Sequence, residues 1–421
     1  MELRIDKTKA YGLVLEGGGA KGAYQIGAWR ALREAGIRIR GVAGASVGAL
    51  NGAMICMNDL EKAEYLWENI SYSKVMDVDD ELMERLRKGR LRSEHVKKIL
   101  NEGFRFLREG GVDVTPLRRL IEATVDEDKI RRSPCDLYVV TYSLTDRKKI
   151  YVNLKETEPG MMKDMLLASA YFLAFKNEPL HGKKYADGGG VNNVPVDILV
   201  EKGYENIIVV RIYGLGRDTE KTLRIPQGTQ VYHIAPRQDL GGILEFDRKK
   251  CKRNMQLGYL DAKRMIYGLE GRYYYLDAPC TESAYARRLF ARNEIVRLWM
   301  QKHGFPEEEA VAGKSMRCDA EEIFPESAKE LKLKEDWNYK DLYLAMLEEM
   351  ARVYHVPRLH IYTLKTLKHE ILVRVQAQQI KEYQTFQAMK PQKDKNAVWR
   401  GKIGAVQKTC AANKARKRQN G

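Results

Sequence analysis

The segment Gly44-Ala45-Ser46-Val47-Gly48 carries the first sign of chemistry, because it has the pattern G-x-S-x-G. This pattern is typical of a serine on a sharp turn between a strand and a helix, with its hydroxyl exposed for nucleophilic attack. Bulky neighbours would clash in so tight a turn, and Gly44 and Gly48 relieve that crowding. The helix that follows would direct its free N–H groups towards the reaction centre. The segment therefore predicts a nucleophilic serine at position 46.

A second glycine-rich segment, Gly17-Gly18-Gly19-Ala20-Lys21-Gly22, closes a strand upstream of this serine. Its free N–H groups could stabilise an oxyanion if they lie beside Ser46. The segment also satisfies G-x-G-x-x-G, which in a dinucleotide-binding fold is followed about 20 residues later by an acidic residue. The corresponding stretch, 37–41, contains no Asp or Glu. We therefore expect an oxyanion role for these glycines rather than nucleotide binding.

A serine hydroxyl is a weak nucleophile near neutral pH, so a base must take its proton. Asp187, followed by Gly188 and Gly189, lies in a glycine-rich loop and is the candidate, although D-G-G is also a common plain turn. The chain order Ser46, Asp187, His233 permits a second mechanism, a triad in which His233 is the base. His233 lies in an apparent strand, which favours a core or sheet-edge histidine. His181 is interpreted as a turn residue.

The elements that must position these residues alternate between strands and helices. Strands are expected at 11–15 and 37–43, each followed by a glycine turn and then by a helix, at 20–35 and 47–57. This order is typical of a parallel sheet covered by helices. Further along the chain the sequence predicts an edge hairpin at 135–144 and 149–154, strands at 206–213 and 229–234, and helices at 161–174, 196–202 and 248–269. The tyrosines at 273–275 suggest a strand packed on the core.

Two regions do not follow this alternation. Residues 58–109 are charged and mostly helical in pattern, as expected of a lid or cap. Residues 283–302, 328–354 and 361–390 look helical and charged. We therefore expect two domains, an acyl hydrolase domain over residues 1–275 and a mainly helical region with a basic tail over residues 276–421.

Three motifs, in the order described above, resemble those of the patatin-like phospholipases over residues 11 to about 270. Ala168-Ser169-Ala170 before the third motif and Asn193-Val194-Pro195 after it add to the resemblance. The resemblance implies a three-layer α/β/α sandwich with a mostly parallel sheet. It also implies a Ser46–Asp187 dyad, with an oxyanion hole drawn from the amides of Gly17, Gly18, Gly19 and Val47. One departure is visible: relatives often carry a proline where this chain has residues 171–173.

Composition limits the other possibilities. Hydrophobic residues make up 44% of the 421 residues and charged residues 31%, as in a globular protein. The longest apolar stretch, 165–175, is shorter than the roughly 18 residues needed to cross a membrane. The charged first residues do not resemble a signal peptide. Six scattered cysteines form no C-x-x-C pair and seven histidines show no metal-ligand spacing, so we expect no metal, no cofactor and a cytoplasmic location.

The net charge of +16 is unevenly distributed. Residues 361–421 contain 14 Lys and Arg against 3 Asp and Glu, a net charge of +11, which leaves +5 for the rest. The run Lys414-Ala-Arg416-Lys417-Arg418 is interpreted as either a solvated basic terminus or a segment attracted to anionic lipid headgroups. Nucleic-acid binding is not favoured, because the tail has one Trp and no stacking pattern.

These observations predict a serine lipid acyl hydrolase, of phospholipase A or lysophospholipase type, that acts through an acyl-enzyme. The expected partners are a phospholipid or other lipid ester and, peripherally, an anionic membrane surface. Two alternatives remain open. One is a membrane-associated binding protein with vestigial catalytic residues, and the other is an acyltransferase that uses the same acyl-enzyme.

Overall fold

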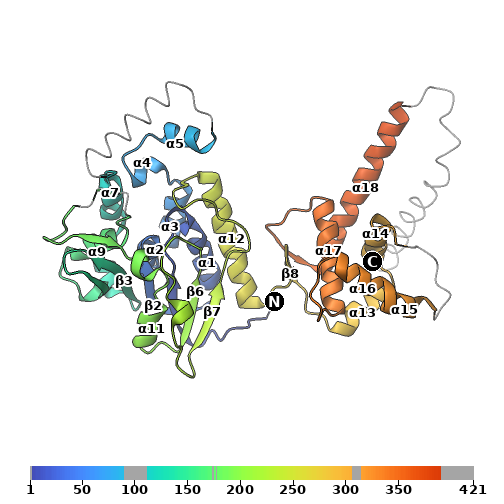
Figure 1. The fold of residues 1–421 in the computed structure, drawn as a ribbon, viewed down its shortest axis with the longest axis horizontal. Helices are drawn as coiled ribbons and strands as arrows, with labels where there is room; N and C mark the ends of the chain where they lie inside the picture. The colour runs from blue at the N-terminus through green and yellow to red at the C-terminus, as the bar shows by residue number, and fades with distance from the viewer. Residues whose placement is uncertain (1, 90–110, 173–174, 177, 306–313, 390–421) are drawn as a thin grey trace, which may run out of the picture. The chain divides into compact units, whose positions relative to one another are not determined.

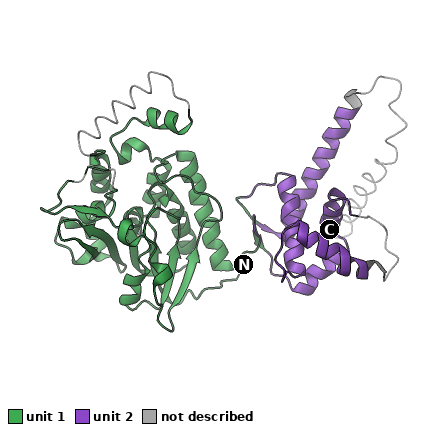
Figure 2. Ribbon diagram, in the orientation of Figure 1, with its two compact units in different colours: residues 1–270, 274–277, 359–361 green, residues 271–273, 278–358, 362–421 purple. Residues whose placement is uncertain are grey.

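The computed structural model describes residues 2–89, 111–172, 175–176, 178–305 and 314–389 (Figure 1). The chain forms two compact units (Figure 2). The first comprises residues 1–270, 274–277 and 359–361, and the second comprises residues 271–273, 278–358 and 362–421. The basic run at 414–418 and the part of the expected cap from 90 to 109 lie outside the described residues.

A seven-stranded sheet forms the centre of the first unit. Its main path runs β4-β3-β2-β1-β6-β7, and β5 pairs with β3 off this path. Strands β1, β2, β3, β6 and β7 are mutually parallel, whereas β4 and β5 run antiparallel to β3. The strands are β1 (Ala10–Leu15), β2 (Arg38–Ala45), β3 (Asp136–Ser143), β4 (Lys148–Asn153), β5 (Tyr185–Asp187), β6 (Asn206–Val210) and β7 (Gln230–Ile234). The mostly parallel sheet and the edge hairpin β3–β4 are as predicted.

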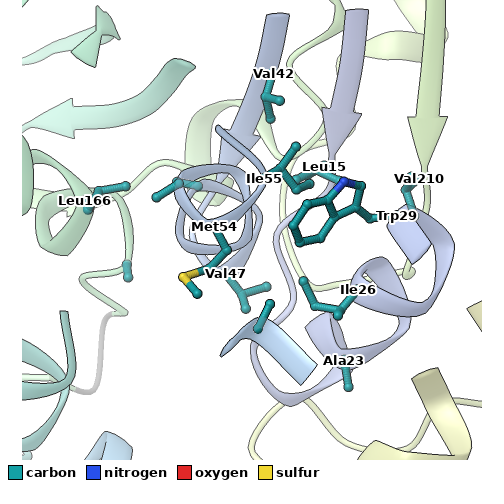
Figure 3. Close-up of a cluster of buried hydrophobic side chains, with 14 of the residues drawn as sticks. Leu15, Ala23, Ile26, Trp29, Val42, Val47, Met54, Ile55, Leu166 and Val210 are labelled. Carbon is teal, nitrogen blue, oxygen red and sulfur yellow. The ribbon is translucent and has the colours of Figure 1, made fainter. Parts of the chain in front are cut away.

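Helices cover both faces of the sheet. Along β1 the side chains of Leu13 and Leu15 join a large apolar cluster, whereas Val14 joins a smaller one on the opposite face. This alternation follows from the two-residue period of a strand. Figure 3 shows part of the large cluster, in which Trp29 and Ile26 of α1 lie beside Leu15 and Val210 of the sheet. The architecture is therefore the predicted three-layer α/β/α sandwich.

The larger cluster is covered by most of the helices and the smaller one mainly by α11. Their bounds are η1 (Gly19–Gly22), α1 (Ala23–Glu34), α2 (Val47–Cys56), α3 (Leu60–Glu68), α4 (Tyr72–Val75), α5 (Asp80–Arg87), α7 (Thr115–Thr124), α8 (Glu127–Arg132), η2 (Leu154–Glu156), α9 (Met161–Ser169), α10 (Gly189–Asn192), α11 (Val196–Glu201), η3 (Glu220–Thr222) and α12 (Arg248–Tyr267).

The second unit is mainly helical, as the charged periodic segments predict. It contains α13 (Glu282–Phe290), α14 (Glu294–Lys302), α15 (Lys314–Cys318), η4 (Asp319–Ile323), α16 (Phe324–Glu330), α17 (Tyr339–Val353) and α18 (Leu364–Met389). The first unit also includes the strand β8 (Tyr275–Asp277), which pairs with β9 (Ile361–Thr363) in a short two-stranded sheet. Tyr274 and Tyr275 are fully buried, as predicted, whereas Tyr273 is partly exposed and precedes the strand.

The segment 283–302 is two helices rather than one. Arg292 has a positive φ of 41°, and the Asn293 side chain accepts hydrogen bonds from the amides of Ile295 and Val296. An asparagine that satisfies free amides in this way begins a new helix. Arg292 also pairs with the buried Asp319 at 2.6 Å, and this contact distant in sequence holds the break in place.

Candidate active site

Ser46 lies on the sharp turn between β2 and α2. Its φ of 54° and ψ of −125° are a rare backbone conformation for a residue other than glycine. Such strain persists only where the surrounding structure enforces it, and it is frequent at functional sites. A Cβ on Gly44 would lie 2.4 Å from the Gly48 carbonyl carbon, and one on Gly48 would lie 2.2 Å from the Leu15 carbonyl oxygen. Only glycine fits at both positions, which explains the spacing of the motif.

The register of β3 brings Asp187 to this turn. Ala45, the last residue of β2, pairs with Val140, and Thr141, the next residue of β3, pairs with Asp187 at the end of β5. Strands β2 and β5 therefore follow one another along the same edge of β3 and run towards each other. Ser46 and Asp187 lie where the two strands meet.

The Asp187 carboxylate has two polar neighbours. It accepts a hydrogen bond at 2.7 Å from the Gly189 amide. Burial raises the pKa of Asp187 to about 6, although the nearby Ser46 side chain and the Gly189 amide oppose that rise. Burial dominates because removing a carboxylate from water penalises its charged form. Gly188 fits this turn closely, since a Cβ there would lie 2.0 Å from the Val140 carbonyl oxygen.

The glycine turn after β1 supplies backbone amides beside Ser46. The Gly17 amide, expected in the oxyanion hole, instead donates to the Asn193 carbonyl oxygen at 3.2 Å. Within the described residues, no acceptor is recorded for the amides of Gly18, Gly19 and Val47. The amides of Gly19 and Val47 lie at helix starts, where intrahelical acceptors are lacking. The available donors are thus a subset of the predicted four.

The remaining motif residues support the turn. Ala20 and Gly22 are buried in η1, and a Cβ on Gly22 would lie 2.5 Å from the Val47 side chain. The Lys21 ammonium donates to the Tyr213 carbonyl oxygen at 2.7 Å, and Lys21 is not among the residues that line the cavity described next. Lys21 therefore bonds to the backbone beside this turn instead of lining the cavity.

A mainly apolar cavity of about 710 Å³ opens onto Ser46 and Asp187. This volume lies in the usual range for small-molecule sites. The lining comes from α2, α3, α7 and the loops after the sheet strands, and it includes Met54, Leu66, Trp67, Leu117, Leu120, Ile121, Phe172, Phe175, Ile243 and Phe246. Phe172 lies in the segment that departs from the relatives' proline, so this departure falls on the cavity wall.

Two buried hydroxyl side chains that the sequence did not identify as site residues fix the turn at Ser46 and the segment that leads to Asp187. The Ser169 hydroxyl donates to the Val140 carbonyl oxygen at 2.6 Å and accepts from the Ser46 amide at 3.0 Å. The Thr141 hydroxyl contacts the carbonyl oxygens of Ala168 and Ala186 at 3.1 and 3.0 Å. The sequence contained Ser169 only as a flanking similarity, because its partners are distant along the chain.

Neither candidate histidine lies at this site. His233 is on β7, at the opposite edge of the sheet from β4, and its Nε2 pairs with Glu220 at 2.6 Å. Glu220 in turn pairs with Arg211. His181, in a turn with φ of 49°, pairs with Asp164 at 2.9 Å. The structure thus brings Ser46 and Asp187 together without His233.

Among the described residues, no three or more His, Cys, Asp or Glu side chains cluster in a way that could hold a metal ion. Nor does any helix in the same residues have the length and apolar character needed to cross a membrane. The five described cysteines are free thiols.

Comparison with known proteins places these features in a family. The family model described as Patatin-like phospholipase matches residues 13–200. These residues form a patatin-like domain. The resemblance predicted from the three motifs is confirmed over this range, which contains Ser46, Asp187 and the glycine turn.

The patatin-like domain has curated relatives of much greater length. Neuropathy target esterase sws of Drosophila melanogaster is 28% identical over 216 residues, which are 50% of this chain and 13% of that protein. Patatin-like phospholipase domain-containing protein 7 of Rattus norvegicus is 24% identical over 216 residues, 50% of this chain and 14% of that protein. The chain therefore spans only a small part of the length of these relatives.

The solved structures to which the chain shows similarity are more distant in sequence. VipD from Legionella pneumophila is 13% identical, with a TM-score of 0.38 over 82% of this chain and 84% of that chain. The type III effector protein ExoU is 14% identical, with a TM-score of 0.31 over 87% of this chain and 74% of that chain.

Proposed function

We propose that the patatin-like domain hydrolyses lipid esters with Ser46 as nucleophile and Asp187 as general base. The observation that carries the proposal is the β3 register, which sets Ser46 beside Asp187 at the wall of an apolar cavity. The family match over residues 13–200 and the names of the relatives support the same class of reaction.

The reaction has two halves. Asp187 takes the proton of Ser46 while the serine oxygen attacks the acyl carbonyl carbon. The tetrahedral intermediate collapses, the ester bond breaks, and the proton on Asp187 passes to the departing alcohol. A water molecule then gives a proton to Asp187 and attacks the acyl carbon; the bond from that carbon to Ser46 Oγ breaks, Asp187 returns the proton to Oγ, and the fatty acid is released. No metal or cofactor is needed for these steps.

Two properties of the site fit these steps. A base with a pKa of about 6 is mostly ionised at neutral pH and can still hold a proton briefly. The amides of Gly18, Gly19 and Val47 are proposed to bind the oxyanion, where one such donor contributes about 3–4 kcal/mol in well-studied enzymes.

The apolar cavity favours an acyl chain over a sugar or a nucleotide, which would need more polar groups along the wall. We therefore propose a phospholipid or other lipid ester as substrate, cleaved by a phospholipase A or lysophospholipase type of reaction. A cytoplasmic location with peripheral contact to membranes fits the proposal.

The test is fatty-acid release from phospholipid and lysophospholipid vesicles by the full chain and by Ser46→Ala and Asp187→Asn. Release that both substitutions reduce by about 10³-fold or more would support the dyad. No release from any lipid or soluble ester would favour a vestigial binding protein. New esters formed when glycerol or lysolipid is supplied as acceptor would instead indicate acyl transfer.

A further inference from the structure

Three leucines at the mouth of the cavity are exposed although they also line it. Leu215 is 73% exposed, Leu144 45% and Leu244 37%, and each belongs to the cavity lining. Single exposed leucines are common on protein surfaces. Three around the opening that leads to Ser46 form one apolar feature. We call Leu144, Leu215 and Leu244 the rim.

The topology explains why these residues gather. Leu144 follows β3, Leu215 lies in the loop after β6, and Leu244 lies in the loop after β7. These three strands are parallel to β1 and β2, so their carboxyl ends meet at one end of the sheet. Ser46 and the glycine turn also follow the carboxyl ends of β2 and β1. The rim and the proposed nucleophile therefore lie at the same end of the sheet.

Basic side chains surround one part of the rim. The Leu144 amide donates to the Lys184 carbonyl oxygen at 2.9 Å, which brings two loops together. These loops, together with the first residue of β4, expose four basic residues, Arg147, Lys148, Lys183 and Lys184. Asp146 pairs with Lys183 at 2.8 Å and offsets one of the four charges. Exposed apolar side chains flanked by positive charge are the composition that binds an anionic lipid surface.

We propose that the rim docks the domain on an anionic lipid surface, with the leucines inserted among the acyl chains and the basic loops against the headgroups. This inference rests on the proposed function and deepens it, because a lipid ester would then enter the cavity from the surface without passing through water. The rim is distinct from the basic run at 414–418, for which the sequence leaves open either a solvated terminus or attraction to anionic lipid headgroups.

Binding is best measured apart from catalysis, in full-length protein carrying Ser46→Ala. Cosedimentation is followed with phosphatidylcholine vesicles with and without phosphatidylglycerol. The Leu215→Ser, Leu244→Ser double substitution is expected to weaken vesicle binding about ten-fold or more. The reason is that binding then no longer transfers two leucine side chains from water into the bilayer. Arg147→Gln with Lys184→Gln should weaken binding only to vesicles containing phosphatidylglycerol, and mainly at low salt.

Ile225→Ser provides the matched control. Ile225 is 38% exposed, close to Leu244, but it precedes β7 and therefore lies towards the opposite end of the sheet. It is not among the cavity-lining residues. Vesicle binding equal to that of the parent is expected for Ile225→Ser, with thermal unfolding measured for every variant to show that it is folded.

The outcomes separate the two proposals. Unchanged binding of the folded rim variants, or an equal loss with Ile225→Ser, would overturn the rim. If Ser46→Ala protein binds vesicles through the rim while the wild type releases no fatty acid, the rim stands and the hydrolase proposal fails. If the wild type hydrolyses lipid and the rim variants bind vesicles normally, the hydrolase proposal stands and the rim proposal fails.

Discussion

Ser46 and Asp187 lie at the facing ends of two strands that share one edge of β3. The pairs Ala45–Val140 and Thr141–Asp187 are adjacent in the register, so a shift of β5 by even two residues would separate the two side chains by several ångströms. Because the proximity of these two residues depends on strand pairing rather than on loop packing, the geometry of the proposed dyad should be insensitive to changes in the surface loops.

The pH dependence of the reaction should report Asp187. Its pKa of about 6 predicts that kcat/KM for a soluble ester falls as the pH drops through 6, because the base becomes protonated. The measurement is a pH profile with a monomeric ester, which avoids effects of pH on lipid surfaces. A rate that stays constant from neutral pH to well below 6 would contradict Asp187 as the base.

Asp187→Asn should make the fold more stable above pH 6, although it should abolish activity. The folded pKa of about 6 exceeds the ordinary value of 3.8, so between these values the folded wild type retains a proton that the unfolded chain has lost. Its free energy of unfolding therefore falls as pH rises through this window, by up to about 3 kcal/mol. Urea denaturation of both proteins below 3.8 and above 6 measures the difference. If the two proteins differ in free energy of unfolding by the same amount at both pH values, the raised pKa of Asp187 would be contradicted.

Ser169→Ala should lower kcat as well as stability. The substitution leaves the Val140 carbonyl oxygen and the Ser46 amide without their recorded partner, at a cost of about 1–3 kcal/mol. Since the second of these groups belongs to Ser46, the proposed nucleophile, we also expect kcat to fall about 10–100-fold.

The control for Ser169 is Ser327→Ala in the second unit. Ser327 is also fully buried and donates to the Ile323 carbonyl oxygen at 2.6 Å. Its loss should reduce the free energy of unfolding without changing kcat. A variant Ser169→Ala that is destabilised but fully active would show that this serine has no role in positioning.

Gly48→Ala should disrupt the turn that carries Ser46. The new Cβ would lie 2.2 Å from the Leu15 carbonyl oxygen, which is backbone and cannot rotate away. We expect a loss of about 1–3 kcal/mol in stability and a large loss of activity. Gly242→Ala is the control, since the nearest atom to its new Cβ is at 3.6 Å. Equal thermal stability of the two variants would contradict the crowding.

His233→Ala distinguishes the dyad from a triad. The His233 imidazole is exposed on β7 and pairs with Glu220. Loss of such an exposed pair lowers the free energy of unfolding by about 1 kcal/mol or less. Ester hydrolysis should stay close to that of the wild type. A loss of about 10³-fold or more would restore His233 as the base.

The local patterns were sufficient to predict a parallel sheet covered by helices and the turn at Ser46, whereas the three-layer sandwich was implied by the family resemblance. The spacing of glycines indicates where the backbone is crowded, and the periodicity of apolar residues indicates which face of a strand or helix is buried. Both patterns involve residues close together in the sequence. The strand predicted at 206–213 ends earlier, at Val210, because the buried Glu16 carboxylate accepts from the amides of Ile212 and Tyr213. No local pattern contains that contact.

In the site too, residues in local motifs were predicted, whereas contacts between distant segments were not. Ser46 and Asp187 were candidates because each lies in a recognisable turn, whereas their proximity depends on the register of β3. Ser169 and Thr141 act through carbonyl groups of distant segments, and a hydroxyl that bonds backbone leaves no sequence pattern. The use of the Gly17 amide by Asn193 is another long-range contact that composition and spacing cannot predict.

The collinear arrangement of β2 and β5 also bears on when the proposed activity would arise during synthesis. Ser46 emerges from the ribosome early, but Asp187 follows a hairpin and a helix that must dock first. Under the proposed function, a nascent or truncated chain ending before Asp187 would carry Ser46 without a proton acceptor. The order of the segments would thus keep an incomplete polypeptide from attacking cellular lipids.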